Sequence, residues 1–255
     1  MRTEMITALS AAQHRQYGLH PDRNFTHAAA WHSTPLGLSE IPEAAGCFPL
    51  FLMKGDQSGT FRLSALLGLS KPCNLYCREG GWGAAYIPLN LLRYPFILGD
   101  NDEDAPALCA DFASPSLVRD DPRALGLYDE GGAPSPLLDE ALRLLLFMRT
   151  DQQNTIPFIE KLLSYDLIRR KDIDLTHKTG TISQISGLYG IDEDALADLD
   201  GASLLSLNAE KYLGLIFAMV QSERHLERLL YLAIRRGDDL VSAHLSMPHE
   251  EGPMP

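Results

Sequence analysis

The stretch SPLLDEALRLLLFMR, residues 135–149, decides the fold class, because the spacing of apolar residues changes there from a strand-like to a helical period. It begins with Ser followed by Pro, which is typical of a helix start. Its apolar residues cover most of the helix circumference, so we expect this helix to lie between other elements. Strands before this stretch and helices after it predict an α+β fold, with an antiparallel β-rich N-terminal half packed against a helical C-terminal half.

Short strands are predicted before this helix, from residue 25 to about residue 130. The apolar runs CFPLFLMKG (47–55) and TFRLSALLGL (60–69) are followed by turns rich in Gly, Asp and Ser. Turns of this kind favour antiparallel pairing. The acidic segment DNDEDAPALCAD (100–111) lacks the glycine and the terminal glutamate of a calcium-binding loop, so we expect a solvated turn there.

Helices dominate the prediction after residue 149. TIPFIEKLLSYDLI (155–168) has apolar residues at helical spacing, with Pro157 starting or kinking the helix. A hairpin is predicted near 172–185 around HKTG and a short helix over 192–199. Residues 208–236 predict one long helix, or two joined at Ser222, ending before Gly237. The predicted organisation is a weakly structured segment (1–24) with a possible short helix through 3–16, a single α+β domain (25–240; β-rich 25–130, helical 134–237) and a disordered tail (241–255).

The composition excludes several classes of partner. The formal net charge is −12, so the chain has no positive field to attract nucleic acid or an anionic membrane surface. No apolar run reaches the roughly 20 residues of a membrane-spanning helix. The N-terminus does not match a secretory signal. We therefore expect a cytoplasmic protein without membrane insertion.

The four cysteines, Cys47, Cys73, Cys77 and Cys109, are expected to be structural thiols in a reducing compartment. Cys73 and Cys77 are spaced C-x3-C, whereas a zinc knuckle requires C-x2-C and a second pair. If they lie on one strand, they share a face of it. The sequence also lacks a phosphate-binding G-x-x-x-x-G-K-[ST] loop and a G-x-S-x-G nucleophile elbow. No catalytic residue and no cofactor are therefore predicted.

A metal site built from histidines is the alternative that would make the protein an enzyme. His27 and His32, with Asp22 or Glu40, could supply the two imidazoles and one carboxylate of a metal-dependent oxygenase or peptide-modifying enzyme. Their spacing, however, places the two histidines on opposite faces of a strand and about 140° apart on a helix. We therefore favour surface or hydrogen-bonding roles for both.

The stretch GGWGAAYIPLNLLRYPFILGD, residues 80–100, is the candidate ligand or partner site. Trp82, Tyr86, Arg93 and Tyr94 belong to the residue types enriched in binding hot spots. Alternatively, Trp82 and Tyr86 share one face of a strand, and Arg93 satisfies buried carbonyls or a carboxylate. We predict that this strand ends at Ile87–Pro88, with a connector through 89–92 and a second strand entered at Tyr94–Pro95. A weaker alternative is carbohydrate stacking on Trp82 and Tyr86.

Six segments together resemble one known family. They are STPLGLSEIPEAAGCFPLFLMKG (33–55), FRLSALLGLSKPCNLY (61–76), GGWGAAYIPLNLLRYPF (80–96), LYDEGGAPSPLLDEAL (127–142), ISGLYGIDEDALADL (185–199) and YLGLIFAMVQSERHLERLL (212–230). The combination resembles the SapC family over about residues 25–235. The motif of that family around Trp82 is kept here as Trp82, Tyr86, Ile87, Pro88, Arg93, Tyr94, Pro95 and Phe96.

The resemblance implies a setting and no reaction. The family name points to surface-layer protein export or presentation in Gram-negative bacteria. The resemblance also implies an association with loci that hold TonB-dependent receptors and flavin-dependent tryptophan-halogenase-like proteins. On this resemblance we expect a cytoplasmic accessory protein that binds a protein or peptide, and the family supplies no catalytic residues to carry over.

Overall fold

The computed structural model describes residues 5–22, 24–55, 60–70, 72–79, 81–99 and 106–247. The chain is 38% helix and 29% strand, with antiparallel sheets in the N-terminal half and helices in the C-terminal half. The α+β prediction is therefore confirmed. The acidic turn predicted at 100–106 lies almost wholly outside the described residues.

Short strands, with short helices between some of them, precede a long helix, α4. The strands are β1 Ile6–Ala8, β2 Tyr17–Leu19, β3 Ser33–Pro35, β4 Leu50–Lys54, β5 Phe61–Leu66, β6 Cys77–Arg78, β7 Gly81–Trp82, β8 Phe96–Gly99, β9 Ala107–Asp111, β10 Leu117–Arg119, β11 Leu125–Gly126, β12 Ile168–His177, β13 Ile182–Ile191 and β14 Leu240–Ser246. The helices are α1 Ala11–His14, η2 Thr26–Ala28, η3 Leu38–Glu40, α2 Ile41–Ala45, α3 Leu89–Leu92, α4 Pro136–Ser164, α5 Glu193–Ala197, α6 Gly201–Ala209, α7 Tyr212–Ser222, η4 Glu223–His225 and α8 Leu226–Arg236.

Contacts between residues gather into two compact units. Unit 1 comprises residues 1–28, 77–82 and 89–150, and unit 2 comprises residues 29–76, 83–88 and 151–255. The sequence predicted one continuous domain over 25–240. The chain instead passes several times from one unit to the other, and short strands separated by turns give no signal of such crossings.

Unit 1 contains two small antiparallel sheets, in the orders β1-β9-β8 and β10-β2-β11, and the short ladder β6-β7. The N-terminal segment, expected to be weakly structured, contributes β1, α1 and β2. Its described residues are ordered because β1 pairs with β9 and β2 lies between two strands. The predicted helix through 3–16 covers only Ala11–His14. One buried core cluster of unit 1 comprises Leu19, Phe96, Ala110, Leu117, Leu127, Leu138, Ala141 and Leu145.

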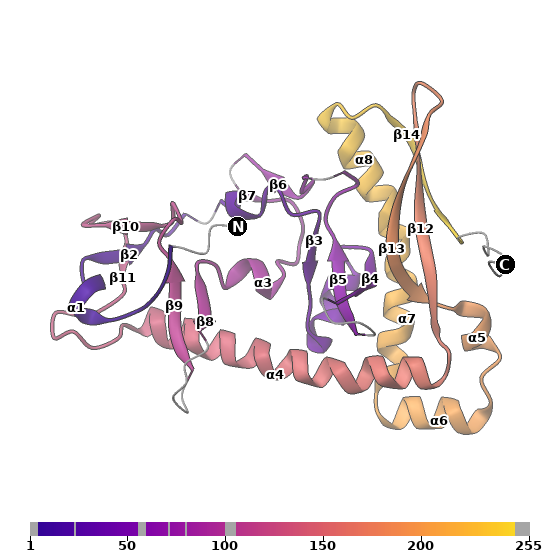
Figure 1. Ribbon diagram of the computed structural model, residues 1–255, viewed down its shortest axis with the longest axis horizontal. Coiled ribbons are helices and arrows are strands. Elements are labelled where there is room, and N and C mark those ends of the chain that lie inside the picture. The colour runs from indigo at the N-terminus through magenta and orange to yellow at the C-terminus, as the bar shows by residue number, and fades with distance from the viewer. Residues whose placement is uncertain are drawn as a thin grey trace, which may run out of the picture. The chain divides into compact units, whose positions relative to one another are not determined.

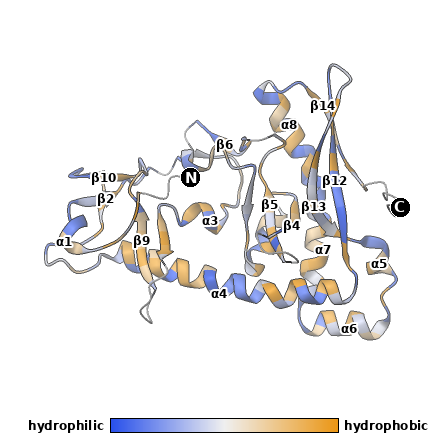
Figure 2. Cartoon of the chain, in the orientation of Figure 1, coloured by the Kyte–Doolittle hydropathy of each residue, from blue (hydrophilic) through white to orange (hydrophobic). Residues whose placement is uncertain are grey.

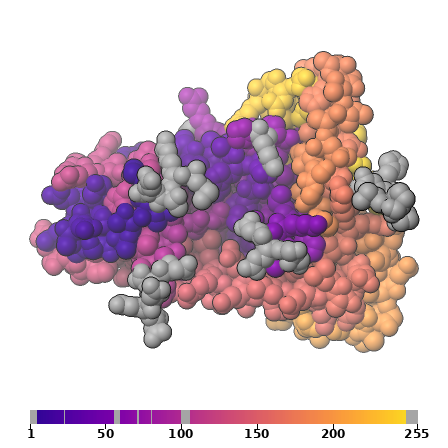
Figure 3. All heavy atoms as spheres, in the orientation of Figure 1, coloured from indigo at the N-terminus to yellow at the C-terminus, as the bar shows by residue number. Residues whose placement is uncertain are grey.

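Unit 2 is built on a six-stranded antiparallel sheet in the order β14-β12-β13-β4-β5-β3 (Figure 1). The hairpin predicted around HKTG is confirmed, since β12 and β13 pair along most of their length. The prediction of a disordered tail from residue 241 is wrong for 241–246, because β14 pairs with β12 and buries Leu240 and Ala243. In the space-filling view, the yellow residues of α8 and β14 lie directly beside the orange hairpin (Figure 3).

The C-terminal helices of unit 2 cover this sheet. α7 contacts β4 and β13, and α8 contacts β14. α8 buries Leu226, Leu229 and Leu232 on one face, and its ribbon alternates between hydrophobic and hydrophilic colours (Figure 2). The predicted division at Ser222 is confirmed, and Gly237 ends α8 with a positive φ of 99°. Among the described helices, no single one is long and apolar enough to cross a membrane; α6 taken together with Tyr212–Arg236 passes by length and composition only, across a 96° bend.

Helix α4 joins the two helices predicted at 135–149 and 155–168 into one of 29 residues, with Pro157 inside it. The intervening residues are polar, which suggested a break. They are helical because Asp151 and Thr155 are buried and satisfied. Thr155 Oγ1 donates to the Asp151 carbonyl one turn earlier, at 2.8 Å.

Candidate ligand-binding site

Arg93 connects α3 to β8 inside unit 1. Its Nε donates to Asn90 Oδ1 at 2.8 Å, and its Nη1 donates to the Phe96 carbonyl oxygen at 3.1 Å. The main chain repeats this connection, since Phe96 N donates to the Arg93 carbonyl oxygen at 2.8 Å. The peptide bond between Tyr94 and Pro95, inside this turn, is cis. Main-chain and side-chain bonds together fix where the guanidinium lies.

The guanidinium lines a pocket of about 340 Å³ in unit 1. Arg93 and Glu140 are its charged lining residues, and the remaining walls are apolar: Leu92, Phe96, Leu137, Ala141 and Leu144. Helix α4 provides one wall because positions 137, 141 and 144 follow helical spacing and share a face. Ala141 also belongs to the buried core, whereas Glu140 is exposed at the rim.

Although Glu140 lines the same pocket, Arg93 forms no ion pair with a carboxylate of the described residues. Burial lowers the pKa of the Arg93 guanidinium, yet arginine stays cationic in proteins. Among the ion pairs between described residues, none within 4.0 Å includes Arg93. Its partners are one amide oxygen and one carbonyl oxygen, both neutral. Burying a cation without a counter-charge costs free energy, which an anion in the pocket would offset.

Trp82 and Tyr94, two further residues of the candidate site, belong to a series of aromatic side chains in contact. Trp82 packs on Phe25 with ring centroids 5.8 Å apart, and His27 stacks on Tyr94 at 4.0 Å. Phe25 and His27 are neighbours in this series at 6.2 Å. The Tyr94 hydroxyl donates to Asp111 Oδ2 at 3.1 Å. Trp82, Arg93 and Tyr94 all lie in unit 1, and Arg93 lines the pocket.

Tyr86 lies apart from this group, in unit 2. Its hydroxyl donates to Glu40 Oε1 at 2.8 Å, and Glu40 Oε2 accepts from Gly37 N at 2.9 Å. Burial, together with the nearby Glu40 carboxylate, raises the pKa of Tyr86. The expected single strand carrying Trp82 and Tyr86 is wrong: β7 ends at Trp82, and Gly83 N bonds to the Tyr76 carbonyl oxygen instead.

The connector predicted at 89–92 is the short helix α3, and the strand predicted to begin at Tyr94–Pro95 begins at Phe96. The cysteines also differ from expectation in their placement. All four are thiols, and Cys77 lies in β6 whereas Cys73 lies outside any strand. The two therefore do not line one strand face. Arg236 Nη1 donates to the Asn74 carbonyl oxygen at 2.8 Å and contacts Cys73 Sγ at 3.4 Å.

The alternative metal site does not form from the described residues. His27 belongs to unit 1, where it stacks on Tyr94 and hydrogen-bonds to the backbone of Leu91, whereas His32 belongs to unit 2. Burial, with Arg93 nearby, lowers the pKa of His27 to about 4. Across the described ranges, no group of three or more His, Cys, Asp and Glu side chains could hold a metal ion.

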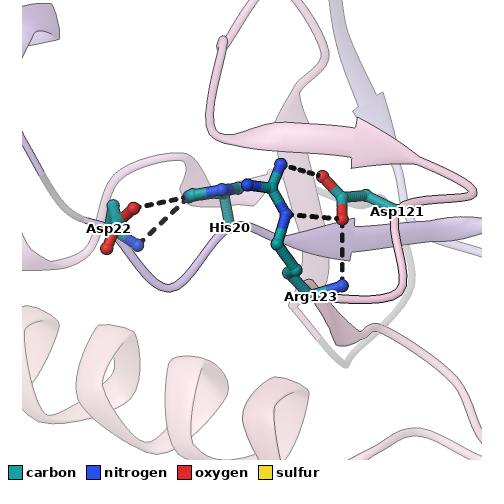
Figure 4. A network of polar contacts seen from close by, with 4 residues as sticks. All are labelled: His20, Asp22, Asp121 and Arg123. Atoms are coloured by element: carbon teal, nitrogen blue, oxygen red, sulfur yellow. Dashed lines mark hydrogen bonds and ion pairs between the residues drawn. The ribbon is translucent and has the colours of Figure 1, made fainter.

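Asp22, one of the two carboxylates considered for that metal site, contacts His20 instead (Figure 4). His20 Nδ1 lies 3.8 Å from Asp22 Oδ2 and accepts from Asp22 N at 3.2 Å. Beside it, Arg123 forms a bidentate pair with Asp121, which lowers the pKa of Asp121 to about 2. Asp22 and Arg123 are exposed. Exposed pairs of this kind contribute little to stability.

A Ser–His–Asp arrangement was missed by sequence reasoning because no nucleophile motif marks it. His177 Nδ1 lies 2.8 Å from Asp239 Oδ1, and His177 Nε2 lies 2.8 Å from Ser183 Oγ. Catalytic triads bury the acid and direct donors at an oxyanion. The Asp239 side chain is 59% exposed here, unlike the buried acid of such a triad. These contacts connect Asp239, directly before β14, to the end of the hairpin formed by β12 and β13.

Comparison with known protein families matches most of the chain. The model of the SapC family matches residues 9–229, a range that includes every residue lining the Arg93 pocket. Neither the curated proteins nor the solved structures gave a match to the chain.

Proposed function

Because the chain belongs to the SapC family, we propose that it is an accessory protein that binds a protein or peptide connected with surface-layer or outer-membrane systems, without catalysing a reaction. The observation that carries this proposal is the partly buried Arg93 guanidinium, which lines an apolar pocket with only neutral hydrogen-bond partners. Arginine beside apolar and aromatic groups is typical of protein-recognition sites.

The chemistry of the pocket supports binding rather than reaction. Among the described residues, its walls carry neither a nucleophile nor a histidine; they are formed by aliphatic side chains, Phe96, the Arg93 guanidinium and Glu140 at the rim. A guanidinium stabilises an anion by hydrogen bonds and charge but does not exchange its proton at neutral pH. The pocket is therefore suited to holding a ligand group.

Carbohydrate binding is not favoured over protein or peptide binding. It required Trp82 and Tyr86 to form one stacking platform. Trp82 packs on Phe25 in unit 1, whereas the Tyr86 hydroxyl is bonded to Glu40 in unit 2. The two side chains do not share a strand face.

Affinity capture from the source bacterium tests the proposal. Tagged wild-type protein, Arg93→Met and the control Arg143→Met would be compared, with bound proteins identified by mass spectrometry. Arg143 is an exposed cation of α4 outside the pocket, so its replacement changes the net charge equally. We expect a partner of the surface-layer or outer-membrane systems that is retained by Arg143→Met and lost by Arg93→Met. Capture of no partner above background, or equal loss in both variants, would contradict the proposal.

A further inference from the structure

We infer that the Arg93 pocket binds the C-terminal carboxylate of a polypeptide whose last residue has an apolar side chain. This inference rests on the proposed function and specifies the part of the partner that is recognised. It depends on three properties of the pocket: the free donors of the guanidinium, the apolar walls, and the negative charge around them.

The Arg93 guanidinium has N–H groups that its described hydrogen bonds do not use. Arginine carries five N–H groups, and the described contacts of Arg93 use one on Nε and one on Nη1. The remaining three lie on Nη1 and Nη2. A carboxylate accepts two such N–H groups in parallel, and this planar geometry suits a guanidinium better than any other side chain. The two bonds already formed to Asn90 and Phe96 hold the group in position beforehand.

The apolar walls of the pocket favour a carboxylate that is attached to an apolar group. Leu137, Ala141 and Leu144 from α4 face Leu92 and Phe96 across a volume of about 340 Å³. That volume is at the lower end of small-ligand pockets. It suits one terminal side chain and its carboxylate, and it is too small for a folded surface to enter. Burial of the terminal side chain supplies hydrophobic stabilisation.

The negative charge around the pocket favours a ligand that carries only one negative charge. Glu140 lies at the rim of the pocket, and the whole chain carries a formal net charge of −12. Phosphate and dicarboxylates would be repelled, because their second charge meets no further cation in the pocket lining. A monocarboxylate on an apolar body gains the Arg93 interaction and the apolar contact with the smallest repulsion. A polypeptide C-terminus and a fatty acid share this chemistry.

Calorimetric titration with small probes tests the inference on the full chain. The probes are N-acetyl-Gly-Gly-Leu with a free carboxylate, the same peptide as its C-terminal amide, and octanoate. We expect the acid to bind at least roughly tenfold more tightly than the amide, because only the acid forms charge-assisted bonds to Arg93. Octanoate should bind more weakly than the acid, since it lacks the peptide groups that reach the rim.

Substitutions on both sides of the pocket complete the test. Arg93→Met should weaken binding of the acid by about tenfold to a hundredfold, and Arg143→Met should leave it unchanged. Glu140→Gln should tighten it by a few-fold, roughly what removal of one exposed like charge gives, whereas the exposed control Glu130→Gln should not. If Arg93→Met does not fold, Glu140→Gln and the comparison of acid with amide still decide the question.

The outcomes separate this inference from the function on which it rests. Equal binding of acid and amide, or no binding of either at millimolar concentration, overturns recognition of a C-terminus, while the capture experiment continues to judge partner binding. Tighter binding of octanoate than of the acid peptide overturns the polypeptide as the source of the carboxylate. Loss of the captured partner in Arg93→Met, together with selective binding of the acid, would support both.

Discussion

The imidazole ring of His27 stacks on the phenol ring of Tyr94, with ring centroids 4.0 Å apart and planes inclined by 14°. The backbone hydrogen bond of His27 to Leu91 holds the ring from the side of α3. The stack therefore ties the segment around η2 to the turn that carries Arg93. A histidine used in this way is a structural element of the pocket's surroundings.

The burial of His27, with the Arg93 charge nearby, makes the stability of unit 1 depend on pH. The folded protein keeps His27 neutral down to a pKa of about 4, whereas the unfolded chain binds the proton near the ordinary value of 6.5. The contribution is complete above pH 6.5 and is lost as the pH falls toward 4. We expect a loss of about 1–2 kcal/mol in the free energy of unfolding over this window, after allowance for solvent screening.

Tryptophan fluorescence can follow unit 1 by itself. The chain has two tryptophans, Trp31 in unit 2 and Trp82 in unit 1, so a Trp31→Phe background leaves Trp82 as the reporter. Denaturant titrations at several pH values would be compared for this background, for added His27→Gln, and for the exposed control His244→Gln. His27→Gln should flatten the pH dependence. An unchanged slope in that variant would show that other groups cause it.

In unit 2, the Asp151 side chain occupies the space that a side chain at position 37 would need. A Cβ atom at position 37 would lie 2.6 Å from Asp151 Cγ and closer still to Oδ2. Asp151 is buried and accepts from Ser39 N at 3.1 Å and from Ser39 Oγ at 2.7 Å, so it has little room to move. Gly37→Ala should therefore cost about 2–3 kcal/mol, through crowding and loss of these bonds.

A double-mutant cycle isolates that coupling. In an Asp151→Ala background the added methyl group meets no carboxylate, so Gly37→Ala should cost about 1 kcal/mol or less. Thermal and chemical denaturation of the four proteins give the interaction free energy. If the two substitutions were additive, the crowding of Gly37 against Asp151 would not be the cause of the effect.

Ser222 fastens α7 to the sheet at the point where the helix breaks. Its Oγ donates to the Met219 carbonyl oxygen at 2.6 Å and accepts from Leu50 N at 3.0 Å, and the residue is fully buried. Ser222→Ala leaves the buried Leu50 N–H without an acceptor and should cost about 1–3 kcal/mol. Denaturant unfolding against the exposed control Ser70→Ala would measure it. Equal stability of the two variants would mean that water replaces the hydroxyl.

The periodicity of apolar residues was sufficient to predict those elements that their own local sequence stabilises. The hairpin of β12 and β13, the break at Ser222 and the end of α8 at Gly237 were all predicted. The alternation Trp82-Ala84-Tyr86 predicted a strand that does not form. Residues 83–88 instead take the conformation that tertiary hydrogen bonds to Tyr76 and Glu40 impose. Local pattern does not contain those partners.

The candidate site was accessible from the sequence only in part. Arg93 was singled out by residue type, and its two alternatives were an internal fork or a pocket. The structure combines them, since the guanidinium satisfies the Phe96 carbonyl and also lines a pocket. The opposite wall comes from Leu137, Ala141 and Leu144, more than forty positions later, and nothing in the spacing of residues links α4 to Arg93.

Nuclear magnetic resonance of the Arg93 side chain tests the central claim most directly. In ¹⁵N-arginine-labelled protein, the Nε–H signal of Arg93 is assigned by its disappearance in Arg93→Met. Titration with N-acetyl-Gly-Gly-Leu acid should shift this signal saturably, while the matched amide at the same concentrations should shift it much less. A shift caused equally by both peptides, or an unmoved Arg93 signal beside a moving signal from another arginine, would contradict the assignment of Arg93 as the receptor of the carboxylate.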